Sequence, residues 1–170
     1  MAEAATHNEN QYLTFTLDRE SFALDITSVR EVLELVNITR VPRTPDFIRG
    51  VINLRGRAVP VVDLKREFGL GETTPTVNTC IIIVEVALDG EDTVLGALAD
   101  SVQEVYEMDA SQIEPPPRMG TPIKNEFIRG MGKTGEQCII ILEAGKVFTS
   151  VEMAGLGHGV VEAGPETTEA

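Results

Sequence analysis

The sequence predicts a mainly β fold built from two small barrels, and three observations support this prediction. Residues 47–50 read FIRG, and the same four letters recur at residues 127–130, eighty positions later. Further short phrases recur in the same order in both halves, which favours two similar modules, since a solenoid would need about three or more repeats. The apolar runs are short and rich in β-branched residues, and glycines separate them, as is typical of small all-β domains.

The first module is expected to open with a strand at residues 11–17, QYLTFTL, in which Leu13, Phe15 and Leu17 alternate onto one face. The phrase AVPVVDL at residues 58–64 is a short apolar run rich in valine. Such a run suits a strand that is buried on both faces. Both segments therefore predict strands in the core of the first module.

The second module repeats this order. CIIIVEV at residues 80–86 corresponds to the first strand, and VQEVYEM at 102–108 matches VREVLEL at 29–35 in the pattern V-x-E-V-x-E-apolar. QCIIIL at residues 137–142 predicts another buried strand. IEPPPRMGTP at residues 113–122 is too rich in proline for a central strand, so it is expected to form a loop.

Signals for helices are few and short. DLKREFGLG, residues 63–71, predicts one or two helical turns that end at Gly69. GKVFTSVEMAGLG, residues 145–157, predicts a helix near the C-terminus that ends near Gly155 or Gly157.

The division into modules follows from these echoes. One domain is expected at residues 11–154, with a first module at about 11–79 and a second at about 80–154. An exchange of strands between the modules at their junction is compatible with this division. The ends, residues 1–10 and 155–170, have the composition of tails and are expected to be mobile.

Cysteine usage and hydropathy indicate the compartment. Cys80 and Cys138 both stand beside isoleucine runs, which predicts buried, reduced and unpaired thiols. Their spacing matches no zinc pattern. No run of 18 apolar residues predicts a membrane-spanning helix, and the N-terminus lacks the features of a signal peptide. These features predict a cytoplasmic protein without direct membrane insertion.

The charge is unevenly distributed. The net charge is −13, yet residues 40–66 carry +5. This basic window holds half of the 14 lysines and arginines: Arg40, Arg43, Arg49, Arg55, Arg57, Lys65 and Arg66, against Asp46 and Asp63. An acidic chain is a poor nucleic-acid binder, and the window lacks stacking aromatic residues. The window is either a solvated surface or a docking site for an acidic protein.

The sequence offers little for catalysis. Both histidines, His7 and His158, lie in the tails, and no glycine-rich phosphate-binding motif is present. Asp25, Asp63 and Asp100 are expected near strand ends, where turn carboxylates are common, and their spacing selects no catalytic pair. No cofactor or metal is therefore expected, and a β scaffold with surfaces for other proteins is the interpretation that remains.

Three long phrases carry a resemblance to a known family. They are FTLDRESFALDITSVREVLEL, TRVPRTPDFIRGVINLRGRAVPVVDL and FIRGMGKTGEQCIIILEAGKV. These phrases resemble the CheW family, the coupling proteins of bacterial chemosensory arrays, and FIRGVINLRG followed by PVVDL is the most specific part. The resemblance spans roughly residues 11–154. It implies two five-stranded, SH3-like barrels packed around a shared apolar core, with short helices.

The resemblance also implies a function. CheW-like proteins are non-enzymatic adaptors that link the regulatory domain of the histidine kinase CheA to the cytoplasmic tips of methyl-accepting chemoreceptors, in arrays at the inner face of the membrane. Carried over by motif, the expected kinase-binding residues are Glu31, Arg55, Gly56 and Arg57. The expected receptor-binding residues are Val29, Val32, Gly50, Asn53, Leu54, Val102 and Val105. Val29, Val32, Leu54, Val102 and Val105 would face a receptor helix across an apolar groove, if the two V-x-E-V segments lie near each other.

Several alternatives stay open. An adaptor of a related array outside swimming chemotaxis would have the same sequence features, and a small β-barrel enzyme that uses carboxylates is a further alternative. A positive φ or a role in binding would each explain Gly50 and Gly130. Gly135 and Glu136 replace Arg55 and Gly56 in the second copy. The second module is therefore not expected to duplicate the contact of the first.

Overall fold

The computed structural model describes residues 11–88, 90–116 and 125–153. The predicted mobile tails and most of the proline-rich segment lie outside the described residues. The first half of the chain forms β1 (Gln11–Leu17), β2 (Glu20–Asp25), η1 (Ile26–Ser28), β3 (Val29–Glu34), β4 (Ile48–Leu54), β5 (Arg57–Asp63) and α2 (Leu64–Glu67). The second half forms β6 (Cys80–Leu88), β7 (Glu91–Ala99), β8 (Ser101–Glu107), η2 (Ala110–Gln112), β9 (Ile113–Glu114), η3 (Asn125–Phe127), β10 (Ile128–Thr134), β11 (Gln137–Leu142) and α3 (Ala144–Met153).

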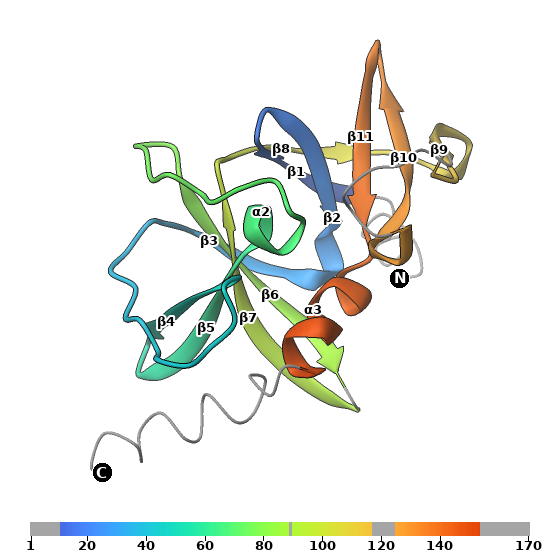
Figure 1. The fold of residues 1–170 in the computed structure, drawn as a ribbon. Helices are drawn as coiled ribbons and strands as arrows, with labels where there is room; N and C mark the ends of the chain where they lie inside the picture. The colour runs from blue at the N-terminus through green and yellow to red at the C-terminus, as the bar shows by residue number, and fades with distance from the viewer. Residues whose placement is uncertain (1–10, 89, 117–124, 154–170) are drawn as a thin grey trace.

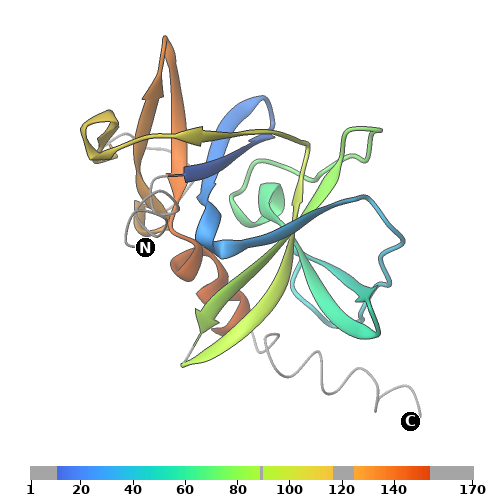
Figure 2. The same ribbon diagram turned by 180° about the vertical axis from the view of Figure 1, so that it is seen from behind.

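The strands form two sheets. The first sheet has the order β8-β1-β2-β11-β10-β9, and the second has the order β3-β6-β7-β5-β4. In Figures 1 and 2 the β4–β5 hairpin and β9 lie at opposite ends of the molecule. The predicted mainly β fold with a helix near the C-terminus is confirmed. The first sheet exceeds the expected five strands because the two-residue β9 adds a short edge strand.

Each sheet combines strands from both halves of the chain. β1 and β2 pair with β8 and β11, whereas β6 and β7 pair with β3 and β5. β1 and β6 hold the same place in their sheets, as do β3 and β8, and the pairing directions also match. The predicted correspondence between QYLTFTL and CIIIVEV is thus seen as strand position. The division of the chain into two modules near residues 79 and 80 stays a prediction. It describes where the sequence repeat begins again, whereas each sheet contains strands from both modules.

The largest apolar core cluster of the described residues joins the two sheets. It includes Phe15 from the first sheet and Val84 from the second, both fully buried. A chain of aromatic rings runs through this cluster, with centroids 5.8–6.1 Å apart between Phe15, Phe22, Phe68 and Phe127. Large buried rings contribute much apolar area and prefer such offset contacts. The shared core therefore holds the two sheets in one unit.

The FIRG phrase builds the same strand start twice. Asp63 N donates to Phe47 O at 2.7 Å, and Glu143 N donates to Phe127 O at 2.8 Å, eighty residues later. The pairing register shifts between positions 48 and 50 in one copy and between 128 and 130 in the other. A bulge of this kind bends the strand locally. The phrase therefore encodes a bulge at the start of a strand in both copies.

The arginine of each FIRG phrase forms the same ion pair. Arg49 Nη1 lies 2.9 Å from Asp63 Oδ2, and Arg129 Nε lies 3.1 Å from Glu143 Oε1. Arg129 also reaches Asp25 at 3.1 Å and so links β10 to β2. The repeated arginine thus ties the bulged strand to the end of its neighbour in both sheets.

The glycine of each phrase allows another backbone to pass closely. A Cβ at Gly50 would lie 2.1 Å from Thr39 O, and a Cβ at Gly130 would lie 2.9 Å from Glu114 O. Of the two explanations left open for these glycines, a positive φ applies to Gly50, whose φ is 145°. It does not apply to Gly130, which is not among the positive-φ glycines. Close packing alone requires glycine at residue 130.

The short helix after β5 ends as predicted, since Gly69 adopts a φ of 76° just beyond Phe68. The described part of α3 ends at Met153, so the predicted stop near Gly155 or Gly157 lies outside the described residues. The proline-rich segment begins with the strand β9 instead of a loop. The described prolines of the segment, Pro115 and Pro116, follow this strand and lie outside it, as expected for residues that cannot donate to a sheet.

The predicted burial of both cysteines is wrong, although both are free thiols as predicted. Cys138 is exposed because it stands one residue inside β11, opposite Lys133, where the hairpin leaves the core. Cys80 is partly exposed at the start of β6, and its thiol donates to Asn78 O at 3.3 Å. The isoleucines that follow each cysteine, and not the cysteines themselves, fill the core.

Candidate functional site: the β4–β5 hairpin and the edge strands

The NLRG letters form a tight hairpin between β4 and β5. Leu54 pairs with Arg57, so Arg55 and Gly56 make a two-residue turn. Their φ values of 51° and 86° are those of a type I′ turn, which requires a positive φ at both central residues. Asn53 Oδ1 accepts a hydrogen bond from Gly56 N at 2.8 Å and supports the turn.

Arg55 is the unusual residue of this turn. Glycine or asparagine is the ordinary choice at a left-handed position, and another residue costs about 1–2 kcal/mol there. The side chain of Arg55 is 70% exposed, so burial does not offset this cost. Strained residues of this kind concentrate at functional sites.

Arg55 forms a bidentate ion pair with Glu31 in β3. Nη1 and Nη2 each donate to a carboxylate oxygen of Glu31 at 2.8 Å. The hydrogen bonds from Arg55 hold the pKa of Glu31 below its ordinary value, and the carboxylate raises the pKa of Arg55. In the structure, Arg55 already makes a bidentate pair within its own chain. A pair between Arg55 and a carboxylate of a partner protein stays a prediction.

The four residues predicted to bind the kinase lie together. Glu31, Arg55 and Arg57 line one cavity of about 180 Å³, together with the apolar Leu54 and Val59, and Gly56 completes the turn beside them. The cavity also takes in Arg30, which lies 3.6 Å from Glu85. An ion pair at the tip of a rigid hairpin, next to an apolar floor, is suited to contact another protein.

The receptor-binding valines fall into two groups. Val32 and Val105 are 41% and 45% exposed and are among the exposed large apolar residues of the described chain. Val29 and Val102 are half-buried and pack against the main core cluster. The same V-x-E-V pattern therefore places its first valine against the core and its second valine in solvent, in both copies.

Both V-x-E-V segments are edge strands. β3 is the edge of the second sheet, and β8 is the edge of the first. Edge strands carry unpaired backbone groups and are usually protected or used for binding. An exposed valine on each edge is thus a candidate contact, while the predicted groove between the two segments stays a prediction.

The other predicted receptor-binding residues differ in exposure. Gly50 is buried against Thr39, so its role in this structure is to allow close packing. Asn53 is exposed and holds the turn, and Leu54 is half-buried against the second core cluster.

The second module has no equivalent of the Arg55–Glu31 pair at its hairpin. Thr134 pairs with Gln137 around a turn of Gly135 and Glu136, in which Gly135 has a φ of 62°. The glutamate of the second V-x-E-V segment, Glu104, accepts a hydrogen bond from Tyr106, which raises the pKa of that phenol. The two hairpins therefore present different chemistry.

Groups suited to hold a metal are absent from the described ranges, where no three His, Cys, Asp or Glu side chains cluster. Within the same ranges, no helix is long and apolar enough to cross a membrane.

Comparison with known proteins identifies the family. The model of the CheW-like domain matches residues 11–152. The chain belongs to the CheW-like family. Among solved structures, it is similar to the scaffolding protein TtCheW from Thermoanaerobacter tengcongensis, with a TM-score of 0.73, 41% identity, and coverage of 82% of this chain and 88% of that one.

Curated CheW proteins agree with this assignment. The chain is 35% identical to the chemotaxis protein CheW of Klebsiella aerogenes over 144 residues, which is 85% of this chain and 84% of the relative. It is 29% identical to the chemotaxis protein CheW of Treponema pallidum, over 91% of each chain. This CheW-like chain therefore belongs to a class of scaffold or adaptor proteins of chemotaxis.

Proposed function

We propose that this chain is a non-enzymatic adaptor that couples the histidine kinase CheA to methyl-accepting chemoreceptors. It would act in a chemosensory array at the inner face of the membrane. The observation that carries the proposal is the Arg55–Glu31 pair, displayed on an exposed hairpin by a residue with a left-handed backbone.

The hairpin is the proposed kinase-binding face. Arg55 binds Glu31 through Nη1 and Nη2, not through Nε, and most of its side chain is exposed. A pair held ready in this way can meet a partner without losing further side-chain freedom, which favours binding. Arg57 and Gly56 extend the face, and Glu31 gives it both signs of charge.

The two edge strands are the proposed receptor-binding face. The tip of a chemoreceptor is helical, and a helix commonly docks through an apolar stripe. Val32 and Val105 offer exposed apolar contacts, and Leu54 lies on the hairpin that leads to the kinase face. Val29 and Val102 would support these contacts from the core side, and Asn53 and Gly50 would fix the backbone beneath them.

A charge swap tests the kinase-binding face. Arg55→Glu is expected to weaken binding to the regulatory domain of CheA by about 1–4 kcal/mol, measured by titration calorimetry at two salt concentrations. The double variant Arg55→Glu with Glu31→Arg can rebuild an ion pair of reversed direction. It should not regain the affinity, because the partner would meet reversed charges.

Lys133→Glu is the matched control. Lys133 forms an exposed pair with Glu114 at 2.7 Å on the second hairpin, outside the proposed face. This control should leave the affinity unchanged. Full recovery by the double variant would mean that the pair only shapes the hairpin, and unchanged affinity of Arg55→Glu at low salt would remove the residue from the interface.

A further inference from the structure

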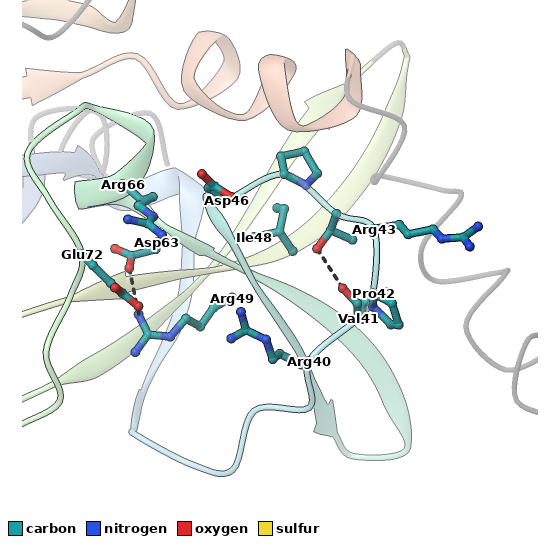
Figure 3. A pocket seen from close by; sticks show the side chains of 12 residues that line it. Arg40, Val41, Pro42, Arg43, Asp46, Ile48, Arg49, Asp63, Arg66 and Glu72 are labelled. Carbon is teal, nitrogen blue, oxygen red and sulfur yellow. Dashed lines mark hydrogen bonds and ion pairs between the residues drawn. The ribbon is translucent and has the colours of Figure 1, made fainter.

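A second cavity, separate from the hairpin face, lies beneath the loop between β3 and β4. Its volume is about 170 Å³, and it is walled by that loop, β4, the end of β5, α2 and the loop after α2. Figure 3 shows this space, which we call the arginine cavity. Four arginines line it, namely Arg40, Arg43, Arg49 and Arg66, against Asp46, Asp63 and Glu72.

The floor of the cavity is a neutralised carboxylate. Asp63 is 1% exposed and accepts hydrogen bonds from Arg49 Nη1 at 2.9 Å, Thr73 N at 3.0 Å and Thr73 Oγ1 at 2.7 Å. With these three donors, its charge is balanced inside the wall. Asp63 therefore contributes little repulsion to an anion that enters from solvent.

Two guanidinium groups, those of Arg40 and Arg66, keep their charge available for such an anion, and Arg49 can add N–H donors. Arg40 and Arg66 are exposed, and no ion pair of either is recorded in the described ranges. The recorded contacts of Arg49, to Asp63 and at 3.9 Å to Glu72, use Nη1, and an arginine has five N–H donors. In Figure 3 the Arg40 side chain extends toward Arg49, and Arg66 lies beside Asp63.

Arg43 belongs to the same loop but points away from the other three arginines in Figure 3. It has a φ of 64°, directly follows Pro42 and stands two residues before Pro45. Thr44 Oγ1 donates to Val41 O at 2.9 Å, and Ile48 N donates to Pro45 O at 3.0 Å. Prolines and local hydrogen bonds stiffen the loop, so the cavity is preorganised.

Size and charge select the ligand. Pockets for drug-sized molecules usually measure about 300–1,000 Å³, so this cavity admits one anionic group rather than a nucleotide. Asp46 and Glu72, both exposed at the rim, disfavour a dianion. A carboxylate carries one charge and accepts paired hydrogen bonds from arginine.

We propose that the arginine cavity binds a carboxylate side chain in an acidic segment of a partner protein. The proposal does not depend on the kinase or receptor contacts, because the cavity shares no lining residue with the one at the hairpin. A single carboxylate in free solution would bind weakly. Several glutamates in one peptide raise the local concentration and make the interaction measurable.

The test uses a fluorescein-labelled peptide of six glutamates and the full chain. Anisotropy is measured at about 0.1 M salt, where the Debye length of about 10 Å screens the overall negative charge. Arg40→Glu and Arg66→Glu should each weaken binding about tenfold or more, as expected when an attractive charge contact becomes repulsive. Arg43→Glu, with the same charge change in the same loop, should weaken it less than about threefold.

Four results would overturn the proposal. The first is undetectable binding of the peptide to the unmodified chain, and the second is an affinity of the Arg40 and Arg66 variants equal to that of the unmodified chain. The third is a loss of affinity in Arg43→Glu as large as in those variants, and the fourth is displacement of the peptide by inorganic phosphate at lower concentration than by glutarate. The last would assign the cavity to phosphate. Circular dichroism checks the fold, and Arg40→Gln and Arg66→Gln replace the glutamate variants if those unfold, with the same direction of change expected.

Discussion

Arg49 reaches from β4 to Asp63 at the end of β5, and the two side chains meet at 2.9 Å where Asp63 is almost fully buried. The FIRG phrase supplies the arginine, and the PVVDL phrase supplies the carboxylate. The arginine and the aspartate of these two phrases therefore form an ion pair inside the fold. Thr73 adds two hydrogen bonds and fixes the loop after α2 to the same carboxylate.

Asp63→Ala is expected to lower the free energy of unfolding by about 3–5 kcal/mol, because it leaves Arg49 without its buried partner. Urea unfolding followed by circular dichroism measures this change. Glu114→Ala is the control, since it breaks the exposed pair with Lys133, which should contribute about 1 kcal/mol or less. Similar losses in both variants would contradict the structural role of Asp63.

Gly50→Ala is expected to disrupt the fold strongly. The added Cβ would lie 2.1 Å from Thr39 O, and the φ of 145° disfavours any side chain. Gly145→Ala in α3 meets no atom within 4 Å and should stabilise the protein by up to about 1 kcal/mol through helix propensity. Thermal unfolding of both variants measures the difference. A fully stable Gly50→Ala protein would show that the backbone at Thr39 does not pass close to residue 50.

The sequence predicts the repeated features well where they are local. The FIRG echo at an offset of eighty correctly indicates equivalent segments in the two halves of the chain. Alternation in QYLTFTL correctly predicts that Leu13, Phe15 and Leu17 are buried. Each of these features depends on the residue's own backbone and immediate neighbours.

Features that depend on distant pairing could not be predicted. Glu31 lies 24 residues before Arg55, and their contact arises only because β3 and the β4–β5 hairpin belong to one curved sheet. The pattern of residues in β8 is the same whichever strand it pairs with, so the sequence alone could not predict that β8 pairs with β1. The exposed Cys138 likewise depends on how far the β10–β11 hairpin projects beyond the core.

The pH dependence of the Arg55–Glu31 pair follows from the lowered pKa of Glu31. The ordinary value is 4.5, and the folded value lies below it because Arg55 stabilises the carboxylate. The pair therefore contributes fully above pH 4.5 and is lost as the pH falls through the lower folded pKa. Carboxyl NMR titration measures the pKa, and Arg55→Gln should return it towards 4.5. An unchanged pKa in that variant would contradict the ion pair in solution.

Val105 is a better position than Val102 for testing the proposed receptor-binding face. Val102 packs against the main core cluster, so a bulkier side chain there would disturb folding as well as docking. Val105 is 45% exposed on an edge strand. Val105→Glu should therefore leave the unfolding free energy within about 0.5 kcal/mol of the original, as is usual at exposed sites.

Sedimentation of CheA with receptor-bearing vesicles tests the coupling most directly. The adaptor account predicts that adding this chain increases the CheA that sediments with the vesicles. It predicts that Val105→Glu loses this increase while still binding CheA, and that Arg55→Glu loses it while still binding the vesicles. If the amount of sedimented CheA is the same with and without the chain, or if both folded variants couple as well as the original, the account is wrong.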